Sequence, residues 1–263
     1  GMNRIELQRL SPSEISTLSG SIAGPDGQRA DVIELLEQET EGNVFFIVEV
    51  MRVLAEEAGG LPNIGRMTLP ESVFAGGIQK AMERRLQKLP ADTIPLLQFA
   101  AIAGKAVDVS LLQHKYNTVD IDRWLTLCSD ANVLEVQNNQ WQFAHDKLRD
   151  GLLQNLSEHE RADLHRQVAE TLQAVYGENS IRFVNLAYHW EKASVEGDTD
   201  TFTLDKAIYY LEKAADQAVE NNLHNEGLVY MDKLFELDKR REKRTGRAAS
   251  REERAHWHFL MSQ

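Results

Sequence analysis

The chain has 263 residues, of which 41 are acidic and 29 are basic, so its formal net charge is −12 at pH 7. A charge of this sign repels phosphate backbones and argues against general nucleic-acid binding. The single cysteine, Cys128, excludes an intrachain disulfide and favours a reducing, cytoplasmic location. The longest uncharged run, residues 93–104, has 12 residues, fewer than the roughly 20 that a membrane-spanning helix needs.

Helical patterns fill the N-terminal third. The sequence SPSE at residues 11–14 is a capping box with proline at the first helical position, and it predicts a helix that ends near residue 22, before Gly24. Further helices are predicted over residues 29–39, 43–58 and 71–88 because apolar residues recur there at intervals of three and four. Together the four helices predict a compact helical unit.

The third of these helices has two predicted faces. Its inner face is predicted to carry Phe46, Val50, Val53 and Leu54. Its outer face is predicted to carry Glu49, Arg52, Glu56 and Glu57. The preceding carboxylates resemble a solvated acidic face far more than a paired acid and base; these are Glu34, Glu37, Glu39 and Glu41.

The middle of the chain changes character. Short helices are predicted over residues 91–103, 110–116 and 120–131, followed by strands at 133–137 and 140–143. The dipeptide between the strands, Asn138-Asn139, suits a two-residue hairpin turn because Asn tolerates positive φ.

Three helices and a hairpin indicate a winged helix. Many such domains place the third helix in the major groove of DNA, which requires basic or amide side chains. Here the third helix carries Asp120, Asp122 and Asp130 against Arg123. We therefore expect no direct DNA binding by this chain.

Helices return after Ala144, over residues 146–156, 158–176 and 180–193, with Asp146 predicted to cap the first. The inner face of the second is predicted to carry Leu164, Val168, Leu172 and Val175. An acidic loop at 194–203 then separates them from an apolar stripe made of Leu204, Ala207, Ile208, Leu211, Ala214, Ala215, Ala218 and Val219.

The last helices have small residues at spaced positions. Ala215, Gly227 and Leu234 occupy the spacing of tetratricopeptide packing positions, although any antiparallel helix pair needs small contacts. Residues 238–254 carry eight basic and four acidic side chains, and we interpret them as a solvated connection; contact with nucleic acid or an anionic surface is the alternative. The apolar pattern that begins near His256 has no stop signal, so we expect a longer parent protein.

No residues predict catalysis. The Gly104-Lys105 pair is followed by Ala106, and Phe99 stands where a P-loop needs its first glycine. Cys128 lacks a local base and is predicted to be a small buried side chain. Two histidine pairs, His159 with His165 and His256 with His258, lack the spacing that places two imidazoles on one helical face. We expect neither an active site nor a metal site.

Several motifs occur in a fixed order. They are EGNVFFIVE at 41–49, LPESV at 69–73, RRLQKLP at 84–90, FAHDKLRD at 143–150 and LHR at 164–166. In this order they resemble the STAND class of signal-transduction ATPases, which are AAA+-related switches in bacterial kinases, adenylate cyclases and transcriptional regulators.

The resemblance implies a mainly α architecture in three parts. Residues 1–89 would form a helical lid, residues 90–156 a winged helix with one hairpin, and residues 157–263 tetratricopeptide-type helix pairs truncated at the C-terminus. The P-loop core would lie N-terminal to this region. The resemblance therefore implies a regulatory fragment that holds no cofactor alone and closes over ATP or ADP held by its own P-loop domain, while its repeats take a protein or small-molecule effector.

Two positions carry the implied nucleotide contacts. His145-Asp146 matches the histidine-aspartate pair of the family, in which the histidine contacts the β-phosphate of ADP and holds the closed state; the alternative is that His145 merely caps the wing. Gly42-Asn43-Val44 matches a Gly-x-Pro element that packs against the base, with Val44 in place of proline, and its alternative is an ordinary helix start. A nucleotide-independent helical-repeat interaction module is the alternative function.

Overall fold

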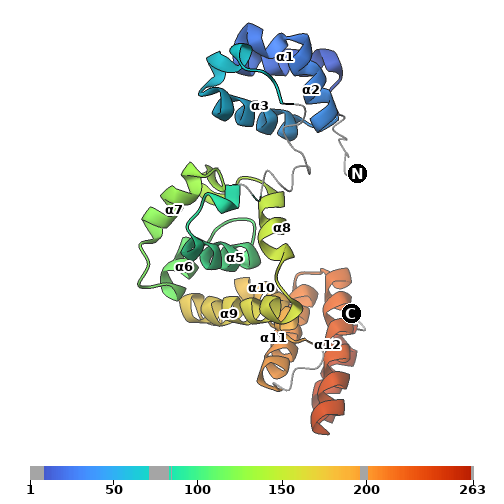
Figure 1. Cartoon of the computed structure of the whole chain (residues 1–263). Helices are drawn as coiled ribbons and strands as arrows, with labels where there is room; N and C mark the ends of the chain where they lie inside the picture. Colours follow the sequence, from blue (N-terminus) through green and yellow to red (C-terminus); the bar gives the residue numbers. More distant parts are fainter. Residues whose placement is uncertain (1–8, 71–82, 84, 196–200, 262–263) are drawn as a thin grey trace. The chain divides into compact units, whose positions relative to one another are not determined.

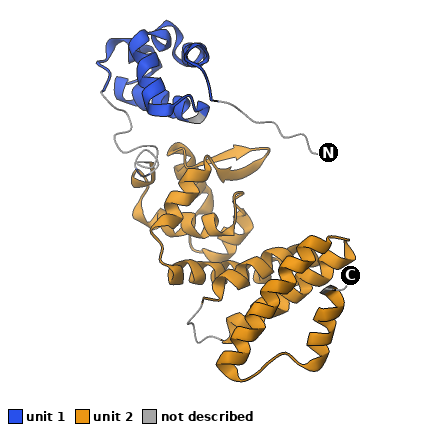
Figure 2. Cartoon of the chain, turned by 90° about the vertical axis from the view of Figure 1, so that its right-hand side faces the viewer, with its two compact units in different colours: residues 1–84 blue, residues 85–263 orange. Residues whose placement is uncertain are grey.

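The computed structural model describes residues 9–70, 83, 85–195 and 201–261. The chain divides into two compact units, residues 1–84 and residues 85–263 (Figure 2). The predicted mainly helical fold is confirmed, and the described residues contain one two-stranded antiparallel sheet (Figure 1). Within these ranges, no helix combines the length and apolar composition that crossing a membrane requires.

The described part of the first unit, residues 9–70 and 83, contains three α-helices and two 3-10 turns. In chain order these are α1 (Pro12–Ala23), η1 (Gly24–Gln28), α2 (Ala30–Thr40), α3 (Val44–Ala58) and η2 (Leu61–Arg66). The predicted capping box starts α1, because the backbone N–H of Ser11 donates to the Glu14 carboxylate at 2.8 Å. The core of the unit includes the buried side chains Ile15, Val32, Leu36, Ile47, Val50, Met51, Leu54 and Ile64.

The buried face of α3 differs from the predicted one. Ile47 and Met51 are fully buried, whereas Phe46 and Val53 are only partly buried. Glu49, predicted to face solvent, is 4% exposed, and an Arg52 nitrogen lies 3.8 Å from its carboxylate. Val50 and Leu54 are fully buried as predicted, and packing against α1 and α2 places Ile47 and Met51 beside them in the core in place of Phe46 and Val53.

The fourth predicted helix, residues 71–88, lies mostly outside the described residues. The described part, at residues 85–87, is helical and belongs to the second unit. There Arg85 is 8% exposed and donates from Nη1 to the backbone oxygen of Asn132 at 3.1 Å.

The second unit begins with the predicted helices and hairpin. They are η3 (Ala91–Thr93), α5 (Ile94–Ala103), α6 (Val109–Lys115), α7 (Ile121–Asp130), β1 (Leu134–Gln137) and β2 (Gln140–Phe143). The strands pair in register from Leu134 with Phe143 to Gln137 with Gln140. Asn138 and Asn139 have φ values of 51° and 60°, so the predicted two-residue turn is confirmed.

A third extended segment lies beside β2 and was not predicted. The N–H of Val107 donates to the oxygen of Trp141 at 2.7 Å, and Ala106 forms a bridge with Gln142. A segment this short is too small to show the alternating apolar pattern of a strand, so the sequence alone does not predict its pairing with β2.

The rest of the second unit is helical. The elements are α8 (Asp146–Gln154), α9 (Glu158–Tyr176), η4 (Ser180–Arg182), α10 (Phe183–Ala193), α11 (Thr201–Glu220), α12 (His224–Thr245) and α13 (Arg251–Met261). Helix α9 packs against α5 and α6 on one side and α10 on the other, and α10, α11 and α12 pack in succession. The predicted apolar stripe of α11 is buried from Leu204 to Ala218, and a Cβ built on Gly227 would meet the Ala218 Cβ at 3.6 Å.

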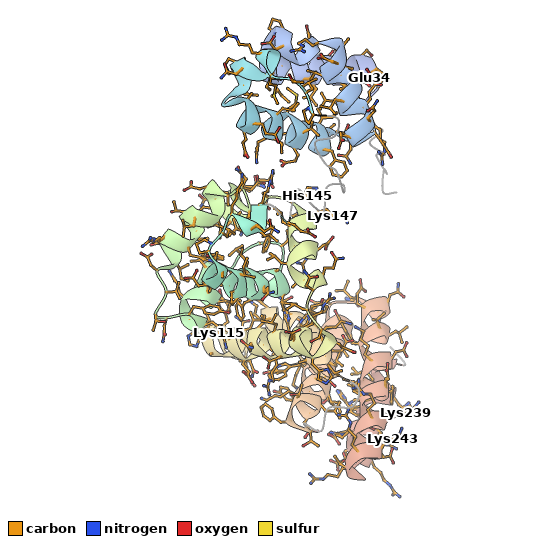
Figure 3. The ribbon with its side chains drawn as sticks, viewed as in Figure 1. Glu34, Lys115, His145, Lys147, Lys239 and Lys243 are labelled. Carbon is orange, nitrogen blue, oxygen red and sulfur yellow. The ribbon has the colours of Figure 1, made fainter. Side chains whose placement is uncertain are left out.

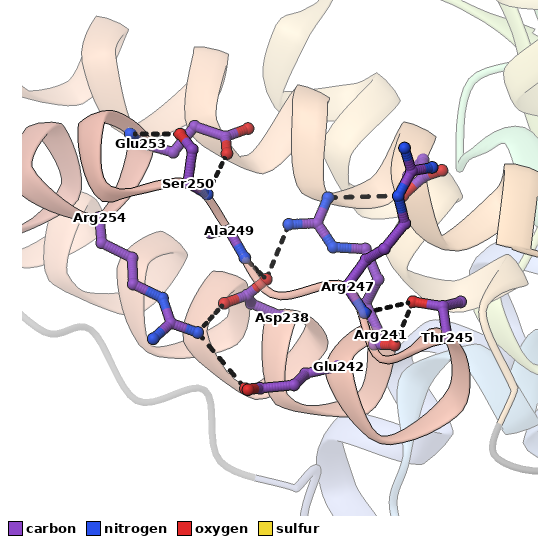
Figure 4. A network of polar contacts seen from close by, with 10 residues as sticks. Asp238, Arg241, Glu242, Thr245, Arg247, Ala249, Ser250, Glu253 and Arg254 are labelled. Atoms are coloured by element: carbon purple, nitrogen blue, oxygen red, sulfur yellow. Dashed lines mark hydrogen bonds and ion pairs between the residues drawn. The ribbon is translucent and has the colours of Figure 1, made fainter.

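The basic stretch 238–254 is more ordered than predicted. It continues α12 to Thr245 and begins α13 at Arg251, so only the short connection between them is non-helical. Asp238 is 3% exposed and accepts a hydrogen bond from the N–H of Ala249 at 2.9 Å (Figure 4). A buried carboxylate therefore organises this connection, which the local charge excess did not predict.

Candidate functional site

The candidate site lies where β2 passes into α8. His145 follows the strand in extended conformation and is the N-cap of α8: its Nδ1 accepts a hydrogen bond from the N–H of Lys147 at 3.0 Å. Asp146 was predicted to be the cap, but it is the first helical residue and is exposed, with an oxygen 3.5 Å from Lys105 Nζ. His145 and Lys147 lie together at the N-terminal end of α8 (Figure 3).

The cap determines where the imidazole carries its proton. Because Nδ1 accepts the amide hydrogen, the neutral ring carries its proton on Nε2. Partial burial lowers the pKa of His145; Asp146 opposes this shift, whereas Lys147 adds to it. The ring is therefore neutral near pH 7, with its proton on the nitrogen that does not cap the helix.

Charged groups of both signs surround this corner. Arg85 also lowers the pKa of His145 through its charge, and burial lowers the pKa of the Arg85 guanidinium itself. Lys147 Nζ lies 3.4 Å from an Asp150 oxygen, and both side chains are more than half exposed. The positive end of the helix dipole favours an anion at the start of α8, and the carboxylates of Asp146 and Asp150 oppose it.

The other predicted contact residues lie in the first unit. Asn43 precedes α3, where its backbone N–H donates to the Thr40 oxygen and its oxygen accepts from the Ile47 N–H. Val44 is 47% exposed. Gly42 has a φ of 77°, and a Cβ there would lie 2.3 Å from the backbone oxygen of Leu10, so this position requires glycine for the fold. The segment has the geometry of a helix start.

A buried histidine pair was missed by the sequence analysis. His165 on α9 and His189 on α10 are 8% and 3% exposed, and their Nδ1 atoms are 2.9 Å apart. Burial lowers the pKa of His165 to about 4 and that of His189 to about 3. Sequence reasoning had considered His159 as the neighbour of His165, and it had placed Leu164 on the inner face where His165 lies.

The remaining reactive groups are structural. Cys128 is fully buried, as predicted, and burial raises the pKa of its thiol to about 12. In the described ranges, no group of three or more His, Cys, Asp or Glu side chains is arranged to hold a metal ion.

Comparison of the chain with protein-family models, with curated proteins and with solved structures gave no match.

Proposed function

We propose that this chain is the regulatory part of a STAND-type ATPase. In this proposal a helical lid and a winged helix close over ADP or ATP held by the protein's own P-loop domain, outside this sequence. Tetratricopeptide-type helix pairs then carry the effector signal. The observation that carries the proposal is the His145 ring at the β2–α8 junction, whose Nδ1 is fixed by a helix amide.

The geometry of His145 suits a phosphate contact. A neutral imidazole with its proton on Nε2 donates one hydrogen bond without adding a permanent charge, so the contact forms and breaks readily as a domain moves. The charges of Arg85 and Lys147 favour an anionic partner, and those of Asp146 and Asp150 oppose it. A hydrogen bond to a charged group contributes about 1.5–3 kcal/mol, so its loss speeds ADP release roughly 10- to 150-fold.

The arrangement of the elements supports the proposed domains. Helices α5, α6 and α7 followed by the β1–β2 hairpin have the order of a winged helix, and the segment at Val107 adds a third partner to the sheet. The exposed side chains of α7 include Asp122 and Asp130, so we assign this domain to nucleotide control rather than to DNA binding. Small residues, Ala218 and Gly227, face each other where α11 and α12 pack, and a Cβ added to Gly227 would meet the Ala218 Cβ at 3.6 Å, which supports helix pairs of tetratricopeptide type.

The test compares two substitutions at His145 in a protein that contains the P-loop domain. His145→Ala removes both the cap and the Nε2 donor. His145→Asn keeps a good N-cap but does not extend a donor to the same place. If His145 contacts the nucleotide, both variants release ADP faster. If it only caps α8, the Asn variant releases ADP as the wild type does.

A matched control removes an exposed imidazole from α9. His159 is exposed, and His159→Ala is expected to leave ADP release unchanged. ADP release is measured by stopped-flow displacement of a fluorescent ADP analogue. Equal rates for wild type and both His145 variants contradict the proposed switch.

The second candidate is a helical-repeat interaction module that does not depend on nucleotide. It is favoured by the succession of packed helices α10, α11 and α12 and by apolar side chains exposed on them, such as Phe202 at 54% and Val229 at 53%. Unchanged nucleotide release in the His145 variants, together with intact effector signalling, supports this candidate.

A further inference from the structure

A cleft in the second unit gathers cationic side chains from several helices. Its volume is about 520 Å³, within the range of small-molecule sites, roughly 300–1,000 Å³. Walls from α5, α8, α9, α10 and α12 enclose it, and its charged side chains include Arg149, Arg161, Lys192, Lys233 and Arg240. None of these residues belongs to the His145 corner.

The three arginines are oriented by backbone oxygens. Arg149 donates from Nε to the oxygen of Ala101 at 2.6 Å, and Arg240 donates from Nη2 to that of Ser194 at 2.8 Å. Arg161 donates from Nη2 to the backbone oxygen of Leu153 at 2.5 Å. Over residues 85–195 and 201–261, no carboxylate forms an ion pair with any of the three. Among the described residues, these guanidinium groups are thus oriented by backbone oxygens and lack a carboxylate partner.

The carboxylates of the cleft do not cancel this charge. Glu191 accepts from Lys233 Nζ at 2.7 Å and lies 3.6 Å from Lys192 Nζ. Glu158 and Glu236 are exposed. Five cations against three carboxylates leave a net charge of +2 with the histidines neutral, in a chain whose overall charge is −12.

Two buried polar atoms beside the cleft are unsatisfied. Ser194 is 8% exposed, and its Oγ has no hydrogen-bond partner in the described part of the chain; the same holds for Nε of Arg240. Buried polar atoms in folded proteins nearly always have partners, so these two atoms leave hydrogen-bonding capacity beside the cleft that the described residues do not satisfy. Both residues line the cleft.

The pKa of His165 is lowered by the same cationic side chains. Besides burial, the charges of Lys192, Arg149 and Arg161 lower its pKa, and Glu191 opposes them. The pKa of His189 on α10 is lowered by burial and also by the neighbouring His165 and Arg149. An anion in the cleft offsets this field and raises the pKa of His165.

We propose that this cleft binds a multivalent small organic anion, one that carries phosphate or carboxylate groups on a partly apolar body. Guanidinium groups bind both kinds of oxyanion in paired hydrogen bonds. The apolar part is expected to lie against Ile102, Leu153 and Leu237, which line the cleft between the charged groups. The inference holds whether or not the nucleotide switch does, because it involves only the second unit.

The test is calorimetric titration of the full chain at low ionic strength with pyrophosphate and, separately, with citrate. Binding of at least one probe with a dissociation constant below about 1 mM is expected. If only pyrophosphate binds, the ligand carries phosphate groups; if only citrate binds, it carries carboxylate groups. If each of the two probes binds, the site accepts both kinds of anion. Absence of binding for both probes up to about 10 mM overturns the proposal.

Variants locate the binding. Arg240→Gln weakens it about tenfold or more, and Lys192→Gln, at an exposed side chain whose loss leaves the fold intact, weakens it about two- to fivefold. The matched control is Lys239→Gln, which removes the same charge from α12 outside the cleft (Figure 3) and changes binding by less than about twofold. Equal weakening by the Lys239 and Lys192 variants overturns the location. NMR titration of His165 gives an independent readout, because its pKa rises only when the anion is in the cleft.

Discussion

Asp238 holds the connection between α12 and α13, and its replacement is expected to release α13. The carboxylate accepts from Arg241 Nη2 at 2.7 Å, from Arg254 Nη2 at 3.2 Å and from the N–H of Ala249 at 2.9 Å (Figure 4). Its side chain is 4% exposed. Asp238→Ala removes all three acceptor contacts and leaves the buried Ala249 N–H without a partner.

The three contacts contribute unequally. The Arg254 side chain is 42% exposed and also lies 3.4 Å from Glu242, so its loss costs at most about 1 kcal/mol. Arg241 is 15% exposed and keeps a longer contact with Asp205 at 3.4 Å. The loss of the Arg241–Asp238 contact and of the acceptor for the Ala249 amide therefore accounts for most of the decrease in the free energy of unfolding. The expected total is about 3–5 kcal/mol. Asp238→Asn retains one oxygen for the amide and is expected to cost about half as much.

Hydrogen–deuterium exchange measures this effect where it occurs. Because α13 is joined to the unit through this connection, amides of residues 249–261 are expected to exchange at least about 100-fold faster in Asp238→Ala, while those of α9 stay protected. Asp232 lies exposed on the same helix, and Asp232→Ala is the matched control. Unchanged protection at Ala249 in the Asp238 variant, or an equal change in the control, refutes this reasoning.

Four further predictions concern burial and backbone geometry. His165 and His189 stay neutral in the folded protein down to pH values near 4 and 3 but take up protons near pH 6.5 when unfolded, so stability falls as the pH drops below 6.5, by up to about 2.7 kcal/mol per unit; equal urea midpoints at pH 7 and pH 5 contradict this. Gly27→Ala would place a Cβ 2.1 Å from a backbone oxygen of α1 and is expected to destabilise the first unit by about 2–4 kcal/mol. Gly151→Ala, whose Cβ meets nothing within 4 Å, is expected to stabilise α8 by about 0.5–1 kcal/mol; thermal melts that fail to separate the two glycine variants contradict both values. The Cys128 thiol, with a pKa of about 12 and no exposed surface, is expected to react with Ellman's reagent only after unfolding, so rapid labelling of the native protein contradicts its placement.

The elements that sequence reasoning predicted well are those with local causes. The turn at Asn138 and Asn139 needs residues that tolerate positive φ, and the start of α1 needs Ser11 and Glu14 three residues apart. Both conditions are complete within four residues of chain. No distant contact is required to satisfy them, so the sequence suffices.

Helix faces were harder to predict because neighbouring positions differ by only about 100° around the axis. Glu49 is buried beside Val50, and His165 is more deeply buried than its neighbour Leu164, so the boundary of a buried face cannot be placed to a single residue from the apolar pattern. The partner helix decides between the two readings. His165 still carried a usable signal, since it lies three and seven residues before the buried Val168 and Leu172.

Long-range pairs gave no such signal. His165 and His189 are 24 positions apart, and Asp238 meets Arg254 across 16 positions and the turn before α13. Their meeting depends on helix lengths and crossing geometry, which side-chain periodicity does not specify. The His145 cap shows the reverse case: the residue was singled out correctly, but its role at the helix start had been given to Asp146, because aspartate is the commoner cap.

The acidic excess of the chain sharpens the interpretation of its cations. The chain has 41 carboxylate side chains and 29 basic ones. Carboxylate partners are thus abundant, so an arginine without one among the described residues is notable. Arg149 and Arg240 instead donate to backbone oxygens, which fix their direction but leave their charge intact. The surrounding negative charge repels anions at a distance, while screening confines that repulsion to about 8 Å at physiological salt. Anion binding in the second unit must therefore come from the arrangement of side chains in the cleft rather than from the net charge of the protein. For that reason, a substitution in the cleft is expected to weaken binding more than a substitution that removes the same charge elsewhere.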